Sequence, residues 1–121
     1  MQAKTPAKKA PVVLVFCVDL QVVASTDKNL DRVGVISGGS IYPFVWNTLL
    51  AARSEGFGGT ITTLGIAQEP ALQKALNLPA HVAIAAIVPL GKPQKQLTKL
   101  RRRSVEDIVK LERFDGAPFK G

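Results

Sequence analysis

Hydrophobic and polar positions along the chain form short apolar runs separated by amphipathic stretches, and this pattern predicts most of the elements. Residues 12–18 and 82–88 are continuous apolar runs rich in valine, isoleucine and alanine, which is typical of strands buried on both faces. Residues 58–64 are rich in threonine and predict a third, shorter strand. Residues 19–36 are mixed and polar, and we expect a loop there.

The longest expected helix covers residues 37–55. Ser37 or Ser40 can cap its start, and Pro43 falls in its first turn if Ser40 is the cap. Gly56 offers a C-terminal stop. A helix that is apolar nearly all round is buried on most sides, so we expect this one to pack on a sheet and against a partner chain. Its two apolar faces are Ile41, Phe44, Val45, Leu49 and Ala52, and Tyr42, Trp46 and Leu50.

The remaining elements are short. Residues 70–76 predict an amphipathic helix that ends at Asn77 and Pro79, and residues 89–93 predict a turn. Ser104 begins a short helix with carboxylates in its first turn, and residues 113–119 predict an extended tail. Residues 1–10 are interpreted as the end of a helix or a leader. Strands that alternate with helices predict helices packed on a sheet, and 121 residues indicate one domain.

The formal net charge of +7 is concentrated in one part of the chain. A basic stretch without any carboxylate holds Lys92, Lys95, Lys99, Arg101, Arg102 and Arg103. Basic surfaces attract nucleic acid, but no aromatic side chain interleaves with this stretch to stack on bases. The pattern therefore favours a site for one or two phosphates over a nucleic-acid groove.

The N-terminal region resembles a signal peptide, because Lys4, Lys8 and Lys9 precede the first apolar run. The valine-rich composition of that run, and the absence of a clear small-residue cleavage site, favour a strand instead. No apolar run approaches the length of about 18 residues that a membrane-spanning helix needs. Cys17 is the only cysteine and is expected to be a small buried hydrophobe, so nothing requires an oxidising compartment. We expect a cytoplasmic protein with no membrane partner.

Residues that carry acid–base or metal chemistry are scarce. His81 is the only histidine and adjoins a proline turn, so a zinc site is unsupported. The serines lack a nucleophile-elbow motif. Gly38 and Gly39 precede the long helix and could help to bind an anion, although close packing of the helix start is the favoured interpretation. A chain with so few such groups can be an enzyme if a cofactor performs the chemistry.

Two stretches of sequence are distinctive. One runs S-I-Y-P-F-V-W-N-T-L-L-A-A-R-S-E-G-F-G from Ser40 to Gly58, and the other is V-P-L-G-K-P, from Val88 to Pro93, followed by the basic stretch and S-V-E-D-I-V. In order and spacing they resemble the second half of the FMN-dependent nitroreductase family. The resemblance covers about residues 10–114. It implies an α+β fold, with a sheet flanked by helices and one long central helix that packs at a homodimer core.

The resemblance also implies a site. Ile61, Thr63 and Leu64 match positions that the family places against the flavin ring, and Thr62 and Gly65 are neighbours that can contribute backbone groups. Arg101, Arg102 and Arg103 match basic residues that hold the FMN phosphate, a task that suits bidentate guanidinium groups. The alternative interpretations are a threonine-rich β-edge and a solvated charged linker.

The family's first half, with its arginine–serine–arginine phosphate motif, has no counterpart before residue 12. We therefore expect residues 1–121 to form a single but partial nitroreductase-like domain. The first hypothesis is an FMN-dependent NAD(P)H oxidoreductase that reduces nitro, quinone or related small conjugated acceptors. The second is a truncated, non-catalytic remnant that dimerises or binds flavin weakly. The third, ranked last, is a basic nucleic-acid-binding module.

Overall fold

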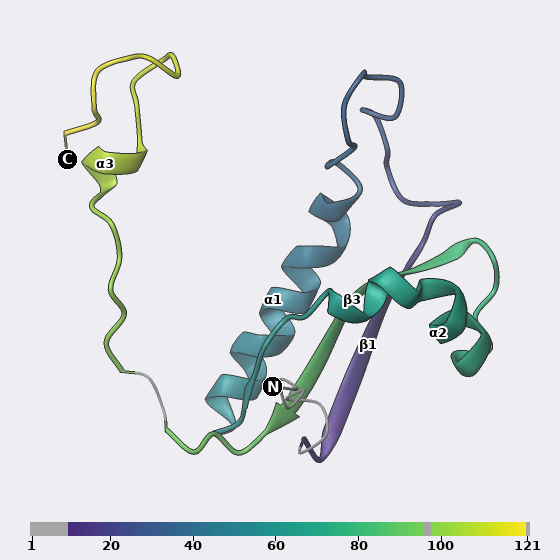
Figure 1. Ribbon diagram of the computed structural model, residues 1–121. Helices are drawn as coiled ribbons and strands as arrows, with labels where there is room; N and C mark the ends of the chain where they lie inside the picture. Colours follow the sequence, from purple (N-terminus) through teal and green to yellow (C-terminus); the bar gives the residue numbers. More distant parts are fainter. Residues whose placement is uncertain (1–9, 96–97, 121) are drawn as a thin grey trace, which may run out of the picture.

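The computed structural model describes residues 10–95 and 98–120, and these form an α+β fold (Figure 1). The interpretation of residues 1–9 and their lysines lies outside the described residues. Three antiparallel strands make one sheet in the order β1-β3-β2, where β1 is Val12–Asp19, β3 is Val82–Gly91 and β2 is Gly58–Gly59. The α-helices in the described residues are α1 (Gly38–Ser54), α2 (Glu69–Leu76) and α3 (Val105–Ile108), and a 3₁₀ helix, η2 (Leu64–Gln68), leads directly into α2.

Helix α1 lies on one face of the sheet and closes the hydrophobic core. Val45 is fully buried in the middle of α1, where it packs with Phe16 of β1 and with Ala86 and Val88 of β3. Ile41 and Leu49, at neighbouring positions on the same helix face, are partly buried against this cluster. The predicted helix and its core-facing residues Ile41, Val45 and Leu49 are therefore confirmed. Phe44 meets Phe16 edge-on at a centroid distance of 5.4 Å, yet remains 59% exposed.

The segment formed by η2 and α2 contacts the other face of β3. Successive strand residues point to opposite faces, so Ile87 faces away from the core side that Ala86 and Val88 occupy. A Cβ placed on Gly65 of η2 would lie 2.8 Å from Cδ1 of Ile87 and 3.5 Å from Cδ1 of Leu72. Helix α2 ends at Asn77, which adopts the left-handed conformation at φ 52°. The predicted helix at residues 70–76 is thus confirmed, and it begins one residue earlier.

The predicted strand at residues 58–64 is wrong in its extent, and Pro89 supplies the physical reason. Thr62 and Ile87 exchange both backbone hydrogen bonds, at 2.9 and 3.0 Å. Gly58 lies opposite Gly91 in the same register, so Thr60, midway between Gly58 and Thr62, lies opposite Pro89. In an antiparallel ladder Thr60 and Pro89 would be the next pair to exchange hydrogen bonds. Proline has no N–H to donate. The ladder is therefore reduced to β2 and an isolated bridge at Thr62, and Leu64 and Gly65 lie in η2.

Strand β3 also runs further than the sequence indicated. The expected turn at residues 89–93 begins later, because β3 continues through Pro89 and Leu90 to Gly91. Proline is tolerated at this place because Pro89 lies opposite Val13 of β1 at a position that does not exchange hydrogen bonds with β1. The pairing of β1 with β3 shifts by one residue between Phe16 and Cys17.

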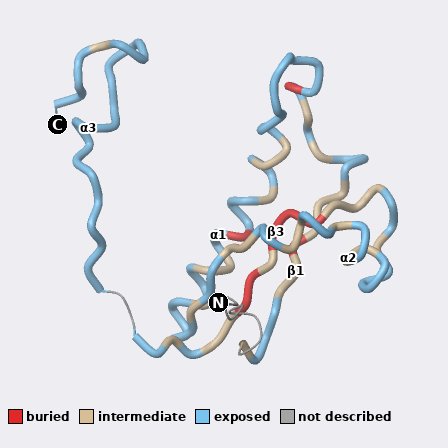
Figure 2. Tube along the Cα trace, viewed as in Figure 1, coloured by how far each residue is buried: buried red, intermediate tan, exposed pale blue. Residues whose placement is uncertain are grey.

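Burial is concentrated on β3 and the middle of α1 (Figure 2). The expectation that β1 is buried on both faces is wrong for the single chain. Phe16 is its only buried residue, and Val12 and Val13 are 49% and 43% exposed. Strand β1 lies at the edge of the sheet, and η2 and α2 pack mainly on β3. For the same reason Cys17 is only partly buried.

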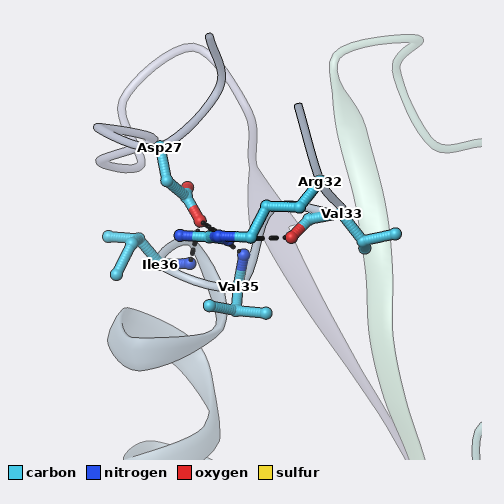
Figure 3. Close-up of polar contacts among 5 residues, drawn as sticks. All are labelled: Asp27, Arg32, Val33, Val35 and Ile36. Carbon is cyan, nitrogen blue, oxygen red and sulfur yellow. Dashed lines mark hydrogen bonds and ion pairs between the residues drawn. The ribbon is translucent and has the colours of Figure 1, made fainter. Parts of the chain in front are cut away.

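The start of α1 is fixed by Asp27 and not by the expected serine cap. Ser37 has helical backbone angles and makes no side-chain cap bond, and Pro43 lies inside the helix beyond its first turn. The buried carboxylate of Asp27 instead accepts hydrogen bonds from the Val35 N–H at 2.8 Å, from the Ile36 N–H at 3.4 Å and from Arg32 at 2.8 Å (Figure 3). These bonds fold the polar loop at residues 20–37 onto the helix start.

The C-terminal segment extends away from the sheet (Figure 1). Ser104 caps α3 by accepting a bond from the Asp107 N–H, as expected. The predicted extended tail is wrong, because the chain turns at residues 113–116 and Lys110 pairs with Pro118. We call residues 98–120 the C-terminal arm. The hydrogen bonds found for its residues lie within the arm itself.

In the part of the chain that the structure describes, no helix combines the length and the apolar character needed to cross a membrane.

We predict that the Asp27 network makes stability depend on pH in acid. The Val35 N–H, then Arg32, hold the pKa of Asp27 below its ordinary value of 3.8, against the opposing effect of burial. Because the folded pKa is depressed, this stabilisation is present above pH 3.8 and is lost as pH falls through the lower folded pKa. In Asp27→Asn, denaturant unfolding should show lower stability than wild type near neutral pH. This difference in stability should shrink as the pH falls below 3.8. A difference from wild type that does not shrink as the pH falls below 3.8 would contradict the prediction.

Candidate functional site

The residues predicted to lie beside a flavin ring occupy the segment that joins β2 to η2. Ile61 is half-buried and its side chain packs against the hydrophobic core. Thr62 is bonded to Ile87 through its backbone. Thr63 and Leu64 emerge on the surface, and Leu64 is 85% exposed. The segment is therefore anchored by Ile61 and Thr62, and it presents Thr63 and Leu64 to solvent.

Local bonds shape this surface turn. The Thr62 hydroxyl accepts a bond from the Leu64 N–H at 3.3 Å, and the Ile66 N–H donates to the Thr63 carbonyl at 3.0 Å. The second bond closes the first turn of η2, so the chain curls instead of continuing along β3. Gly65 follows and fits against Ile87 without a side chain of its own.

A cavity of about 410 Å³ adjoins the start of this segment, at the end of the sheet. Gly58, Gly59 and Thr60 form one side of it, and Leu90, Gly91 and Lys92 form another. Three of these residues are glycines, and most of the other residues that line the cavity are apolar. Lys92 is exposed and is the only cation among the described residues of the lining.

The three arginines predicted to hold a phosphate lie elsewhere. Arg101, Arg102 and Arg103 are exposed in the C-terminal arm, which runs away from the sheet (Figure 1). Arg103 makes one long bond of 3.4 Å to the Asp107 carbonyl. Guanidinium groups so exposed suit phosphate binding in their chemistry. Within one chain, however, the structure does not bring them to Thr63 and Leu64.

Cys17 and the possible metal ligands are the other candidate reactive groups. Burial, and secondly the charge of Glu69, raise the pKa of the Cys17 thiol above its ordinary value of 9.0, which disfavours the nucleophilic thiolate. Across residues 10–95 and 98–120, no three His, Cys, Asp or Glu side chains gather in a way that could hold a metal ion.

Sequence reasoning missed two polar residues that contact the sheet beside this segment. Glu69 Oε1 accepts a bond from the Ile84 N–H at 2.6 Å, and Gln73 Nε2 donates to the Val82 carbonyl at 2.9 Å. A separation of four residues places both side chains on one face of α2. In the sequence this spacing looks like the solvated face of an amphipathic helix, and nothing local distinguishes it from one.

A scan against protein-family models finds no model that matches this chain. The resemblance to nitroreductases therefore rests on the two motifs. The types of the proposed site residues suit FMN, because Thr63 and Leu64 form an exposed turn for the ring and the three arginines offer guanidinium groups for the phosphate. Their positions in a single chain do not fit it, because the two sets are separated.

We predict that Gly59 tolerates no side chain, since the wall of this site depends on close approach. A Cβ at Gly59 would lie 2.5 Å from Leu90 Cδ2 and 2.9 Å from the Pro89 carbonyl oxygen. The carbonyl belongs to the backbone and cannot rotate away, so Gly59→Ala should destabilise the fold by about 1–3 kcal/mol.

The matched control is Gly39→Ala, where a new Cβ would meet nothing within 4 Å. Gly39 lies in the first turn of α1, so alanine there should be neutral or stabilising by up to about 1 kcal/mol. Urea unfolding of both variants measures the difference. Equal effects of the two substitutions would contradict the close packing of β2 on β3.

Proposed function

We propose that the chain belongs to an FMN-dependent NAD(P)H oxidoreductase of the nitroreductase type, acting on nitro, quinone or related conjugated acceptors. The observation that carries the proposal is the path of the chain after α1. It turns at Gly56 (φ 79°), pairs with the end of β3 through Gly58–Gly59, and then exposes Thr63 and Leu64 beside the sheet. This is the helix–glycine–threonine order on which the family resemblance rests.

The cofactor would supply the electron-transfer chemistry, because the described residues offer no acid–base set for it. The chain's own contribution is binding. Thr63 and Leu64 would border the ring and limit access of water to one side of it. Arg101, Arg102 and Arg103 would neutralise the phosphate through charge-assisted hydrogen bonds.

The proposal requires the arginines and the Thr63–Leu64 turn to meet, and a homodimer would provide a second arm. Helix α1 leaves a stripe of large apolar side chains uncovered: Tyr42, Trp46 and Leu50 are 42%, 57% and 52% exposed.

A second candidate is a non-catalytic remnant that dimerises through the same stripe or binds flavin weakly. The separation of the arginines from Thr63 and Leu64 within one chain favours it. Each charge-assisted bond that is not formed costs roughly 1.5–3 kcal/mol, which weakens binding about ten- to a hundredfold. Purified protein that quenches no flavin fluorescence at saturating FMN would select this candidate. Tight DNA binding at physiological salt without any flavin binding would select a nucleic-acid module instead.

We predict that Thr63→Trp abolishes FMN binding and any NAD(P)H oxidation, because the indole would occupy the space proposed for the ring. Fluorescence titration with FMN measures the binding. Thr26→Trp, at an exposed loop threonine, is the matched control and should bind as wild type does. Non-specific DNA affinity, which follows phosphate charge and salt, should be the same in both variants. Normal flavin binding by Thr63→Trp would show that the ring lies elsewhere.

We further predict that Trp46→Glu converts a homodimer to a monomer. A carboxylate cannot be buried cheaply in an apolar interface, whereas exposed Trp46 makes no large contribution to the core of one chain. Light scattering coupled to size exclusion at about micromolar concentration measures the mass. Asn47→Glu places the same charge on an exposed neighbouring position of α1, outside the stripe, and should remain dimeric. A wild-type protein that is monomeric under these conditions would contradict the dimer.

A further inference from the structure

Strand β3 lacks a strand partner along half of one side. Towards β1 it is paired from Val82 to Leu90. On its other side, the strand-like pairing found among the described residues comes from β2 at Leu90 and Gly91 and from Thr62 at Ile87. The backbone from Val82 to Ala85 therefore has no strand beside it there, although Ile84 and Ala85 are only 3% and 8% exposed. Buried backbone groups left without partners would cost roughly 1–3 kcal/mol each.

Side chains take the place of the absent strand. Glu69 Oε1 accepts from the Ile84 N–H at 2.6 Å, Gln73 Nε2 donates to the Val82 carbonyl at 2.9 Å, and the Tyr42 hydroxyl donates to the Ala85 carbonyl at 3.1 Å. Of these three, Glu69 makes the shortest bond, and its acceptor is a carboxylate. Bonds of this charge-assisted kind are roughly twice as strong as neutral ones.

Glu69 also closes a short loop that contains the candidate site. The loop starts at Thr62, which is bonded to Ile87 in both directions, and ends at Glu69, which is bonded to Ile84. Midway along it, Gly65 lies so close to Ile87 that a Cβ would meet Cδ1 at 2.8 Å. Residues 62–69 are thus held on β3 at both ends and in the middle, and Thr63 and Leu64 lie between the first two of these contacts.

We propose that Glu69 is a positioning residue, whose bond to the Ile84 N–H holds the 62–69 loop on β3 and thereby fixes where Thr63 and Leu64 are presented. Its effect on flavin binding rests on the proposed function, but its effect on the loop does not. A simpler role is available to Glu69, because it is the first residue of α2 and a carboxylate there favours the helix dipole. The test must separate these two roles.

Two substitutions separate them. Glu69→Gln removes the charge but keeps an acceptor oxygen with the same reach, and Glu69→Asp keeps the charge but is shorter by one methylene. Positioning predicts that Asp, which falls short of the Ile84 N–H, is impaired more than Gln, which keeps a weaker neutral bond, whereas a role in the helix dipole predicts the reverse order. Lys74→Ala changes an exposed residue of the same helix and is the control. Neither Asp nor Gln leaves a cavity large enough to threaten folding.

The first measurement is amide hydrogen exchange by NMR on the full chain without flavin. In Glu69→Asp, protection of the Ile84 amide should fall about tenfold or more, as expected when one hydrogen bond is lost. Protection of the Thr62 and Ile87 amides should fall with it, while it falls less in Glu69→Gln and stays at the wild-type level in Lys74→Ala. Unchanged protection of Ile84, or loss at Ile84 without loss at Thr62 and Ile87, would overturn the proposal.

The second measurement is the FMN titration with the same variants. Glu69→Asp should weaken binding about tenfold or more, in proportion to the loss of protection at Thr62. Unaltered affinity in a variant with a loosened loop would overturn the link between the loop and the site. A wild-type protein that binds no FMN would overturn the proposed function alone, since the exchange experiment judges the position of the loop without any ligand.

Discussion

The backbone of β3 has hydrogen-bonding groups on both sides, and none of its ten residues is exposed, so these groups need partners inside the protein. Every element of the sheet-forming part of the chain is arranged around that requirement. Strand β1 pairs along one side of β3. On the other side, β2 and Thr62 pair with the C-terminal half of β3, and side chains from α1 and α2 bond its N-terminal half. Helix α1 then covers one face of β3 and packs Val45 against it.

This arrangement explains why the site candidate is a turn and not a strand end. Pro89 cannot donate to Thr60, so the third strand breaks after Gly59 and the chain is free to curl at Thr63. The curl is held by the Thr62–Ile87 pair and by Glu69, and it leaves Thr63 and Leu64 on the surface. A single missing backbone donor thus shapes the surface at which the proposed function would operate.

The C-terminal arm and the outer stripe of α1 both carry large apolar side chains that remain uncovered. Phe114 in the arm is fully exposed, and Trp46 on α1 is more than half exposed. Exposed apolar surface of this extent marks an interaction site in a stable protein. The arm carries the arginines that the proposed function needs, so assembly and cofactor binding would depend on one another.

Local pattern in the sequence determined the helices α1 and α2 and the strands β1 and β3, because apolar periodicity and stop residues such as Gly56 and Asn77 act within a few residues. The sequence also singled out the Thr62–Leu64 segment and the three arginines as candidate site residues. Three features were decided only by the tertiary structure. Pro89 interrupts β2 because the register places it opposite Thr60, Asp27 replaces the serine cap by reaching Val35 and Ile36, and Glu69 bonds Ile84 across the sheet edge. Each of these contacts joins residues that are brought together by the folding of distant segments or of a loop. A pattern within a short stretch of sequence does not predict such a contact. The separation of Arg101, Arg102 and Arg103 from Thr63 belongs to the same class, because no local pattern in residues 98–120 records where the arm lies relative to the sheet.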